Sequence, residues 1–318
     1  MISVVIPVYN AEKFIRKAVE SVLIQPKVSE IILVEDASPG NALAVCQQLY
    51  KENPEKIKLF QHPDKGNHGA GASRNLGIEK ASSKYIAFLD ADDYYLPGRF
   101  KNDIKILESD PSIDGIYNAL GTDVIDKSEM ERAKEKYGEK QLSTVFYPIP
   151  PDKLFEEMFP LGNQGWFHLD CITLRKKVFE KVGLFQDLEI SEDTLLFLKI
   201  AATHKLVSGI INKPVAMRGV HTNNRIKNEE KFRQYQPIMF RELLEWGNKN
   251  ASLNKGRKEK VWDAYYRSLV NKQIMLPSYN MKLHISRYSF LLKSLFMYPF
   301  LLTSLTYYKK LPLLHRFI

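Results

Sequence analysis

Cysteine is scarce in this sequence. Its 318 residues include two cysteines, Cys46 and Cys171, and neither lies at a spacing typical of metal ligands. Two cysteines cannot build the disulfide framework of a small secreted domain, so the composition favours a reducing compartment. No signal peptide is expected either, because Ile2–Val8 has the pattern of a strand one residue after the first methionine. We therefore expect a cytoplasmic protein.

Acidic residues are missing from the C-terminal part of the chain. After Asp263 there is no Asp or Glu, while eight basic residues follow it: Arg267, Lys272, Lys282, Arg287, Lys293, Lys309, Lys310 and Arg316. The first 263 residues hold the remaining 38 basic residues and all 37 acidic ones, a net charge of +1. The basic charge of the protein belongs to its tail, which counts against nucleic-acid binding by the whole chain.

The dinucleotide fingerprint GxGxxG is absent after the first expected strand. At that place the sequence has Tyr9, Asn10 and Ala11. This argues against a dinucleotide-dependent dehydrogenase. Asn10 is instead a candidate N-cap for a helix whose apolar residues, from Phe14 to Leu23, recur at helical spacing.

Strands and helices alternate along the first hundred residues. We expect strands at Ser3–Val8, Glu30–Val34, Ile57–Phe60 and Tyr85–Leu89, with helices at 14–23, Asn41–Tyr50 and Ala72–Ala81. This alternation predicts an α/β fold with a mainly parallel sheet and helices on both of its faces. Such sheets bind ligands in the crevice at the carboxyl ends of their strands.

A cluster of acids follows the last of these strands. Asp90, Asp92 and Asp93 lie within four residues, and unpaired carboxylates so close together repel one another. A hard divalent cation resolves that repulsion, because carboxylate oxygens are its preferred ligands. The alternative is a loop of solvated acids and helix caps. Farther along, Asp123–Gln141 is highly charged and has the composition of a partly mobile surface insertion.

Four motifs in order now define a resemblance. They are SVVIPVYNAEKFIRKAVESVL, IILVEDAS, GASRNLGIEKASSKYIAFLDADD and SEDTLLFLK. Over about residues 1–225 the sequence resembles the family 2 glycosyltransferases, which have the Rossmann-like GT-A fold. The resemblance implies an inverting transferase that moves a sugar from a nucleotide-sugar donor, UDP-linked, to a glycan or lipid-linked acceptor in surface polysaccharide or lipooligosaccharide synthesis.

The resemblance also implies which residues bind the donor. Tyr9 offers a ring face for stacking of the base, and Asp36 matches the acid that accepts a hydrogen bond from uracil. Arg74 matches a basic residue near the diphosphate. The full donor set is Pro7, Tyr9, Asp36, Arg74, Asp90 and Ala91. Asp36 could alternatively cap the following helix, and Arg74 could be an ordinary surface residue.

The metal and the catalytic base follow from the same resemblance. Asp90 and Asp92 match the metal-binding DxD, with Asp92 the more direct ligand to Mn²⁺ or Mg²⁺ and His221 a further candidate. Asp193 matches the general base, which removes the proton of the acceptor hydroxyl. Glu192 and Trp166 are candidates near the acceptor, and His68 is a weaker candidate. Acids at a helix start and an aromatic core residue are the ordinary alternatives.

Two other functions compete with this interpretation. A sugar nucleotidyltransferase would carry a Gly-rich triphosphate loop with Lys or Arg after the first strand, and Tyr9-Asn10-Ala11 lacks both. A non-catalytic nucleotide-sugar-binding protein of the same fold would be favoured by loss of an acid from DAD or SED, and both motifs are intact.

The tail lies outside the resemblance. We expect a catalytic domain at 1–225 and a helical region at 226–318, whose last part, 281–318, contains the apolar run Tyr288–Tyr308. The run could just span a bilayer, but Lys293 and Pro299 interrupt it, which suits an interfacial anchor better. The alternative is a helix packed on the catalytic domain. An anchor would place the protein at the inner face of the membrane.

Overall fold

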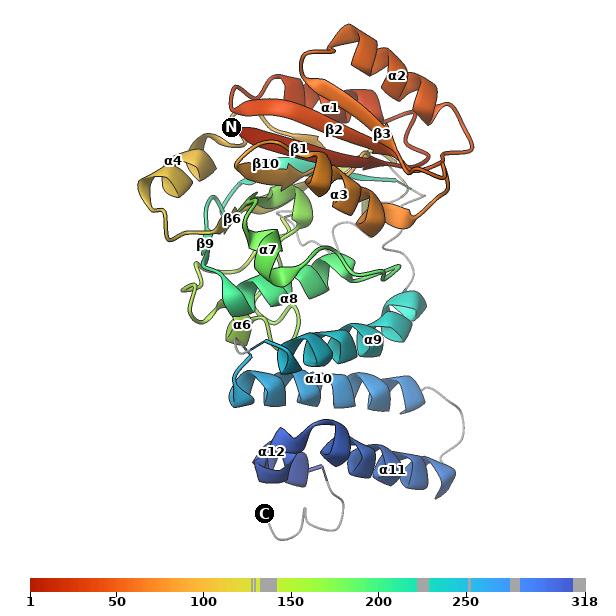
Figure 1. Ribbon diagram of the computed structural model, residues 1–318, viewed down its shortest axis with the longest axis vertical. Helices are drawn as coiled ribbons and strands as arrows, with labels where there is room; N and C mark the ends of the chain where they lie inside the picture. The colour runs from red at the N-terminus through yellow and green to blue at the C-terminus, as the bar shows by residue number, and fades with distance from the viewer. Residues whose placement is uncertain are drawn as a thin grey trace. The chain divides into compact units, whose positions relative to one another are not determined.

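The computed structural model describes residues 1–126, 128, 130–131, 142–221, 229–250, 253–274 and 281–310. The chain divides into two compact units, Met1–Lys227 and Asn228–Ile318 (Figure 1). Most of the insertion expected at Asp123–Gln141 lies outside the described residues.

The first unit is built on a seven-stranded sheet. Its strand order is β3-β2-β1-β4-β8-β6-β9. The strands are β1 (Ile2–Val8), β2 (Val28–Glu35), β3 (Ile57–Gln61), β4 (Tyr85–Phe88), β6 (Gly115–Tyr117), β8 (Ile172–Arg175) and β9 (Leu206–Ser208). All neighbouring pairs are parallel except those that involve β8, which is antiparallel to β4 and β6. The prediction of a mainly parallel α/β sheet is confirmed.

Alternating residues of β1 face two different layers of helices. Ile2, Val4, Ile6 and Val8 belong to the main core, together with the buried residues of α1 (Ile15–Leu23) and α2 (Ala42–Glu52). Val5 faces the other way, toward α3 (Gly69–Lys80). A Cβ on Gly77 would lie 2.2 Å from Val5 Cγ1, so glycine lets α3 approach the sheet closely. Helices therefore cover both faces, as period-two alternation in a buried strand requires (Figure 1).

The first unit also contains a second, smaller sheet and several short helices. A three-stranded sheet has the order β5-β10-β7, and 3-10 helix η2 directly precedes β8. These elements are β5 (Tyr94–Tyr95), α4 (Lys101–Ser109), β7 (Ala119–Val124), α6 (Leu154–Glu157), η2 (Leu169–Cys171), α7 (Val178–Val182), α8 (Glu192–Thr203) and β10 (Pro214–Val220).

The second unit is helical, as expected. It contains α9 (Glu229–Asn248), α10 (Lys255–Ile274), α11 (Met281–Met297), 3-10 helix η4 (Pro299–Thr303) and α12 (Leu305–Tyr308). Trp262 is buried against Tyr266 and Tyr307, with ring centroids 5.6 and 5.4 Å away. Within the described parts of the chain, no helix combines the length and the apolar character needed to cross a membrane.

A buried carboxylate links several strands near their amino ends. Glu30 of β2 accepts hydrogen bonds from Ser3, Lys58 and both the backbone and side chain of Ser82. Burial alone would raise the pKa of Glu30, but these donors outweigh it and lower the pKa to about 2. Glu30 thus ties β2 to β1, β3 and the start of β4.

We predict that Glu30→Gln destabilises the protein in a pH-dependent way. A carboxyl whose pKa is lower in the folded state stabilises the fold above its unfolded pKa and loses that effect as the pH falls. The variant should lose about 2 kcal/mol of unfolding free energy at pH 7, and the difference from wild type should fade between pH 4.5 and 2. Urea unfolding at several pH values measures this. Glu20→Gln, at an exposed ion pair, is the control and should change little; equal pH profiles for all three proteins would contradict the prediction.

Candidate active site

Three neighbouring strands end at one edge of the sheet. Tyr9 follows β1, Asp36 follows β2 and Asp90 follows β4 closely. The register holds these ends level, since Asp36 N donates to Val8 O over 2.9 Å and Leu89 N donates to Val5 O over 3.1 Å. The chain runs outward from β1 to β3 and then returns to β4 on the other side of β1. The edge is therefore a topological switch point, where open sheets bind ligands.

Asp36 anchors the start of α3. Its buried carboxylate accepts hydrogen bonds from the backbone N–H of His68 and of Gly69, each over 2.8 Å. The helix consequently begins at Gly69, three residues before the expected start. Asp36 does cap a helix, but this is α3 and not the helix that follows Asp36 in sequence. Each carboxylate oxygen has a second lone pair, so the predicted hydrogen bond to a base stays a prediction.

Tyr9 leaves its ring open at the end of β1, where 50% of the residue is exposed. Pro7 lies partly buried within the strand. Asn10 is not the N-cap of α1: the helix starts after Phe14, and Asn10 has a φ of 51°, in the left-handed region that asparagine tolerates. His68, the weaker candidate, is exposed, with Nε2 2.9 Å from Asp64 Oδ1 and its ring 4.4 Å from that of His62.

Arg74 is buried between two carboxylates. Its Nη2 donates to Asp90 Oδ1 over 2.7 Å and its Nη1 donates to Glu192 Oε1 over 2.9 Å. Burial would lower the pKa of Arg74, but the charges of Asp90 and Glu192 outweigh it and raise the pKa. Arg74 is therefore not a surface residue. It joins the DAD motif after β4 to the SED motif at the start of α8.

Asp92 faces a histidine that directly follows β10. Its Oδ2 lies 3.1 Å from Nε2 of His221, whose ring stacks on Phe14 at 4.7 Å. Burial and the charge of Asp90 raise the pKa of Asp92. The structure brings Asp92 and His221 together as the sequence suggested, while Ala91 between the two acids is buried.

Asp93 and Asp170 form a buried pair that sequence reasoning missed. Asp170 accepts from Asp90 N over 2.9 Å, and Asp93 accepts from Gly219 N over 2.9 Å. Burial and the charge of Asp170 raise the pKa of Asp93 well above its usual range. The pKa of Asp170 is lowered despite its burial, because His168 and Asp93 interact with its ionised form. The pair fixes the DAD turn against η2 and β10.

His168 and Asp170 also stand beside Asp90. One ligand atom from each of Asp90, His168 and Asp170 lies within 4.8 Å of the others, and His168 Nδ1 is 3.2 Å from Asp170 Oδ2. Carboxylate oxygens with an imidazole nitrogen suit Mn²⁺, and repulsion among the acids favours a cation. These donors thus fit a divalent metal. Asp92, the ligand expected from sequence, is not a member of this group of three.

Asp193 lies at the first turn of α8. Its Oδ1 accepts from the backbone N–H of Thr194 over 2.7 Å, and the side chain is half-buried. The preceding Glu192 is held by Arg74, and Ser191 has a φ of 73°, a left-handed conformation that turns the chain into the helix. Asp193 is near enough to contribute to the charge that raises the pKa of Arg74. It belongs to the same cluster of acids.

Trp166 is partly buried in an aromatic stack. Its ring lies parallel to that of Phe167 at 5.9 Å, and Phe167 stacks on Tyr117 at 4.5 Å. The open part of Trp166 leaves the predicted contact with an acceptor available, and its inner part is core. The packing agrees with the core interpretation of Trp166, and its contact with an acceptor stays a prediction.

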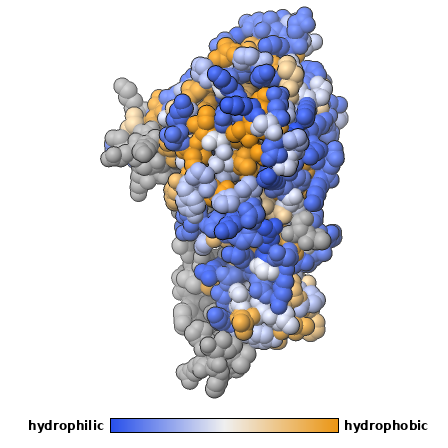
Figure 2. Space-filling view, turned by 90° about the vertical axis from the view of Figure 1, so that its left-hand side faces the viewer, coloured by the Kyte–Doolittle hydropathy of each residue, from blue (hydrophilic) through white to orange (hydrophobic). Residues whose placement is uncertain are grey.

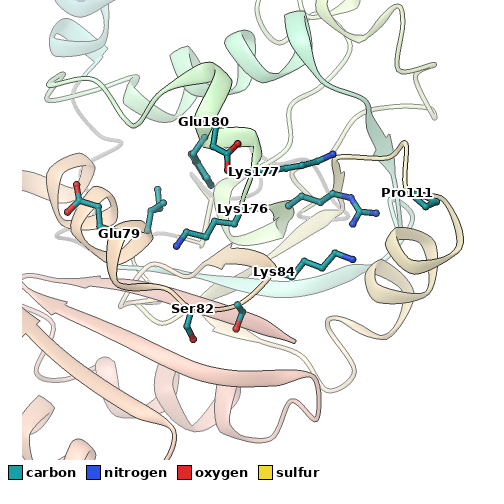
Figure 3. A pocket seen from close by; sticks show the side chains of 11 residues that line it. Glu79, Ser82, Lys84, Pro111, Lys176, Lys177 and Glu180 are labelled. Carbon is teal, nitrogen blue, oxygen red and sulfur yellow. The ribbon is translucent and has the colours of Figure 1, made fainter.

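A cavity of about 810 Å³ lies at the other end of β4 (Figure 3). Of the described residues that line it, none is a predicted site residue. Three of its basic groups already have polar partners: Lys176 donates to Ala81 O, Lys177 pairs with Asp114, and Arg175 donates to Ile113 O and Leu107 O. The fourth, Lys84, lies over the ring of Tyr85. We assign it no ligand.

Comparisons with known proteins show the family to which the chain belongs. The family model described as glycosyl transferase family 2 matches residues 3–183. An uncharacterized glycosyltransferase of Haemophilus influenzae is 26% identical over 70% of this chain and 69% of its own length. One from Nostoc sp. is 35% identical over 57% of this chain and 52% of its own. The chain spans about a third of the matched relative from Rickettsia felis, 31%.

Solved structures show the same fold. The crystal structure of S. aureus TarS in complex with UDP-GlcNAc is similar with a TM-score of 0.61 at 19% identity, over 84% of this chain and 72% of that one. The mannosyltransferase PcManGT of Pyrobaculum calidifontis, in complex with GDP-Man and Mn²⁺, has a TM-score of 0.52 at 14% identity, over 94% and 81%. The expected GT-A type of fold is confirmed.

We predict that Arg74→Met destabilises the first unit strongly. Removing the cation leaves the carboxylates of Asp90 and Glu192 without their partner, which costs about 3–5 kcal/mol in buried ion pairs. Adding Glu192→Gln to Arg74→Met should restore part of the loss, because one of the two charges is then gone. Chemical unfolding at pH 7 measures both.

Arg16→Met is the matched control. Arg16 also pairs with an acid, Glu52, but both side chains are exposed, and its loss should change stability little. An Arg74→Met protein as stable as Arg16→Met would contradict the importance of the buried pair.

Proposed function

Because this chain belongs to glycosyl transferase family 2, we propose that it transfers a sugar from a UDP-linked donor to a hydroxyl group, with inversion at the anomeric carbon. One observation carries this proposal: buried Arg74 holds the DAD acid Asp90 and the SED acid Glu192 in a single cluster. Sugar transfer requires the donor-binding acids and the catalytic base to lie close together, because the leaving diphosphate and the base both act on the same sugar.

The donor would bind across the ends of β1, β2 and β4. Exposed Tyr9 offers a ring for the base. The Asp36 carboxylate accepts from two backbone N–H groups and lies 3.5 Å from His62 Nε2, and each of its oxygens has a second lone pair that a base could use. TarS, which has a similar fold, was crystallised with UDP-GlcNAc, and this supports a UDP-sugar. Pro7 and Ala91 complete the lining of the proposed donor site.

Asp193 would act as the general base. Its carboxylate takes the proton of the acceptor hydroxyl as that oxygen attacks the anomeric carbon, and the bond to the diphosphate breaks on the opposite face. One displacement inverts the configuration, so no covalent sugar–enzyme intermediate is required. Glu192 is a positioning residue, since its carboxylate is engaged by Arg74. Trp166 would lie against the acceptor.

A divalent metal, Mn²⁺ or Mg²⁺, would be held at the carboxyl end of β4. The candidate ligands are Asp90 and Asp92 of the DAD motif, with His221 beside Asp92 and with His168 and Asp170 beside Asp90. When bound, such an ion supplies positive charge to the leaving diphosphate. Arg74 places a fixed cation in the same region, where it holds the acids in their orientation.

The acceptor would be a glycan or a lipid-linked sugar, in surface polysaccharide or lipooligosaccharide synthesis. The basic region after Asp263 favours a place at the inner face of the membrane, where lipid-linked acceptors occur. In this proposal residues 1–225 form the catalytic domain, and residues 226–318 form the helical region whose last part, 281–318, makes the membrane contact.

Thermal unfolding with UDP, GDP, CDP or TDP, each with and without Mn²⁺, tests the donor site. A ligand at 100 times its Kd stabilises the folded state by about 2.7 kcal/mol, so the matching nucleotide should raise the unfolding midpoint. We expect UDP with Mn²⁺ to do so, and Asp92→Ala to abolish the shift. Asp187→Ala, at an exposed acid, is the control and should keep it. No shift with any of the four nucleotides would refute the proposed donor site.

Substitution of the base should separate chemistry from binding. Asp193→Asn removes the proton acceptor and keeps the shape, so we expect kcat to fall by about 10²–10⁴ while the UDP-induced shift is retained. The measurement is nucleotide release from the donor that the thermal screen identifies, with an acceptor found in a glycan screen. Asp187→Asn is the matched control. Unchanged kcat in Asp193→Asn would exclude Asp193 as the base.

A further inference from the structure

The C-terminal helices expose several large apolar side chains over residues 289–310. Inward-facing positions include two serines, Ser294 and Ser304, which are fully buried. Large apolar side chains point outward instead: Leu292, Phe296, Met297, Leu302 and Leu305 are 59, 87, 52, 56 and 67% exposed. We call these five residues the tail surface. The outward face of a helix in a water-soluble unit normally carries polar or charged residues instead.

The inward face is nevertheless well packed. Leu291, Tyr298, Leu301 and Tyr307 are buried, and Tyr307 OH donates to Leu291 O over 2.8 Å. Ser294 Oγ donates to Phe290 O over 2.9 Å, and Ser304 caps α12 by accepting from Tyr307 N. These contacts fix which side of the helices faces inward. The residues of the tail surface therefore point outward because of how this unit is packed.

The density of exposed apolar groups is unusual here. Five of the large exposed hydrophobic residues in the described parts of the chain fall within the 14 positions from 292 to 305. Single exposed apolar residues are normal, whereas a gathering of them marks a contact with a partner or a membrane. Figure 2 shows hydrophobic side chains, in orange, among those of the C-terminal unit.

Charge distinguishes between the partners. The charged residues of 289–310 are all basic, and Lys293 and Lys309 are exposed beside the tail surface. Lys310 is paired with Asp263 over 2.7 Å. A second copy related by a twofold axis would bring lysines toward lysines, with no acid from residues 264–318 to pair them. An anionic lipid surface pairs with lysines and accepts apolar side chains at the same time.

We propose that the tail surface binds the interface of an anionic lipid bilayer. Leu292, Phe296, Met297, Leu302 and Leu305 enter the boundary between head groups and acyl chains, and Lys293 and Lys309 contact lipid phosphates. Since α11 has 17 residues and no described helix could cross a membrane, the contact is interfacial. The inference deepens the membrane placement proposed above by naming the residues and the lipid class. It does not depend on the identity of the donor.

Flotation with vesicles of stated composition tests this. The full chain is mixed with phosphatidylcholine vesicles that contain about 30% phosphatidylglycerol, or with phosphatidylcholine alone, and the bound fraction gives a partition coefficient. The wild type should bind the anionic vesicles. Phe296→Glu/Leu305→Glu should lower the coefficient by about tenfold or more, because it removes two large apolar groups. Lys293→Gln/Lys309→Gln should lower it by about thirtyfold on anionic vesicles and leave it unchanged on neutral ones.

Ile24→Glu is the matched control. Ile24 is also an exposed apolar residue, 60% exposed, but it lies in the first unit, so this variant should bind like the wild type. Because both members of each pair are exposed, the variants should unfold at the same temperature as the wild type. The UDP-induced thermal shift, measured on the same proteins, reports separately on the donor site.

Three outcomes would overturn the proposal. One is a wild type that does not bind anionic vesicles, and another is equal binding by wild type and Phe296→Glu/Leu305→Glu. The third is a wild-type dimer in sedimentation velocity without vesicles that the same double variant converts to a monomer, since the occupant would then be a second copy.

Discussion

The ion pairs of Arg74 hold the DAD and SED acids together. One guanidinium satisfies Asp90 at the end of β4 and Glu192 at the start of α8, two positions about a hundred residues apart in sequence. Burying a cation is costly unless carboxylates surround it, and acids that meet at a sheet edge repel one another unless a cation separates them. Arg74 and its two carboxylate partners therefore stabilise one another in the folded protein. This mutual requirement fixes α3, β4 and α8 in one arrangement and leaves Asp193 directly beside the cluster.

The antiparallel direction of β8 adds two side chains to this group of acids. Because β8 runs opposite to β4, its amino end lies at the edge where β4 ends, and the residues before β8 arrive next to the DAD turn. His168 and Asp170 therefore lie near Asp90, and Asp170 accepts the Asp90 N–H directly. Asp93 secures the other side of the turn, because its carboxyl group accepts the Gly219 N–H. A parallel strand at this place would have carried those groups to the opposite edge.

The C-terminal unit is distinguished by where its apolar and charged side chains lie. The two serines on its buried side are satisfied by backbone groups of their own helices, and its outward face carries large apolar side chains. The absence of acids after Asp263 gives the outward face one sign of charge. In the proposed membrane contact these two features would act together, since apolar burial and attraction to anionic head groups add at the same interface.

The sequence by itself determined the alternation of strands and helices, the acids after β4, the start of α8 and the charge of the tail. These are local properties, set by period and composition. Only the tertiary structure decided which groups meet. It assigned Asp36 to the start of α3, Arg74 to Glu192, and His168 and Asp170 to the side of Asp90. No local pattern marks such contacts, because each joins residues that only sheet order and strand direction bring together.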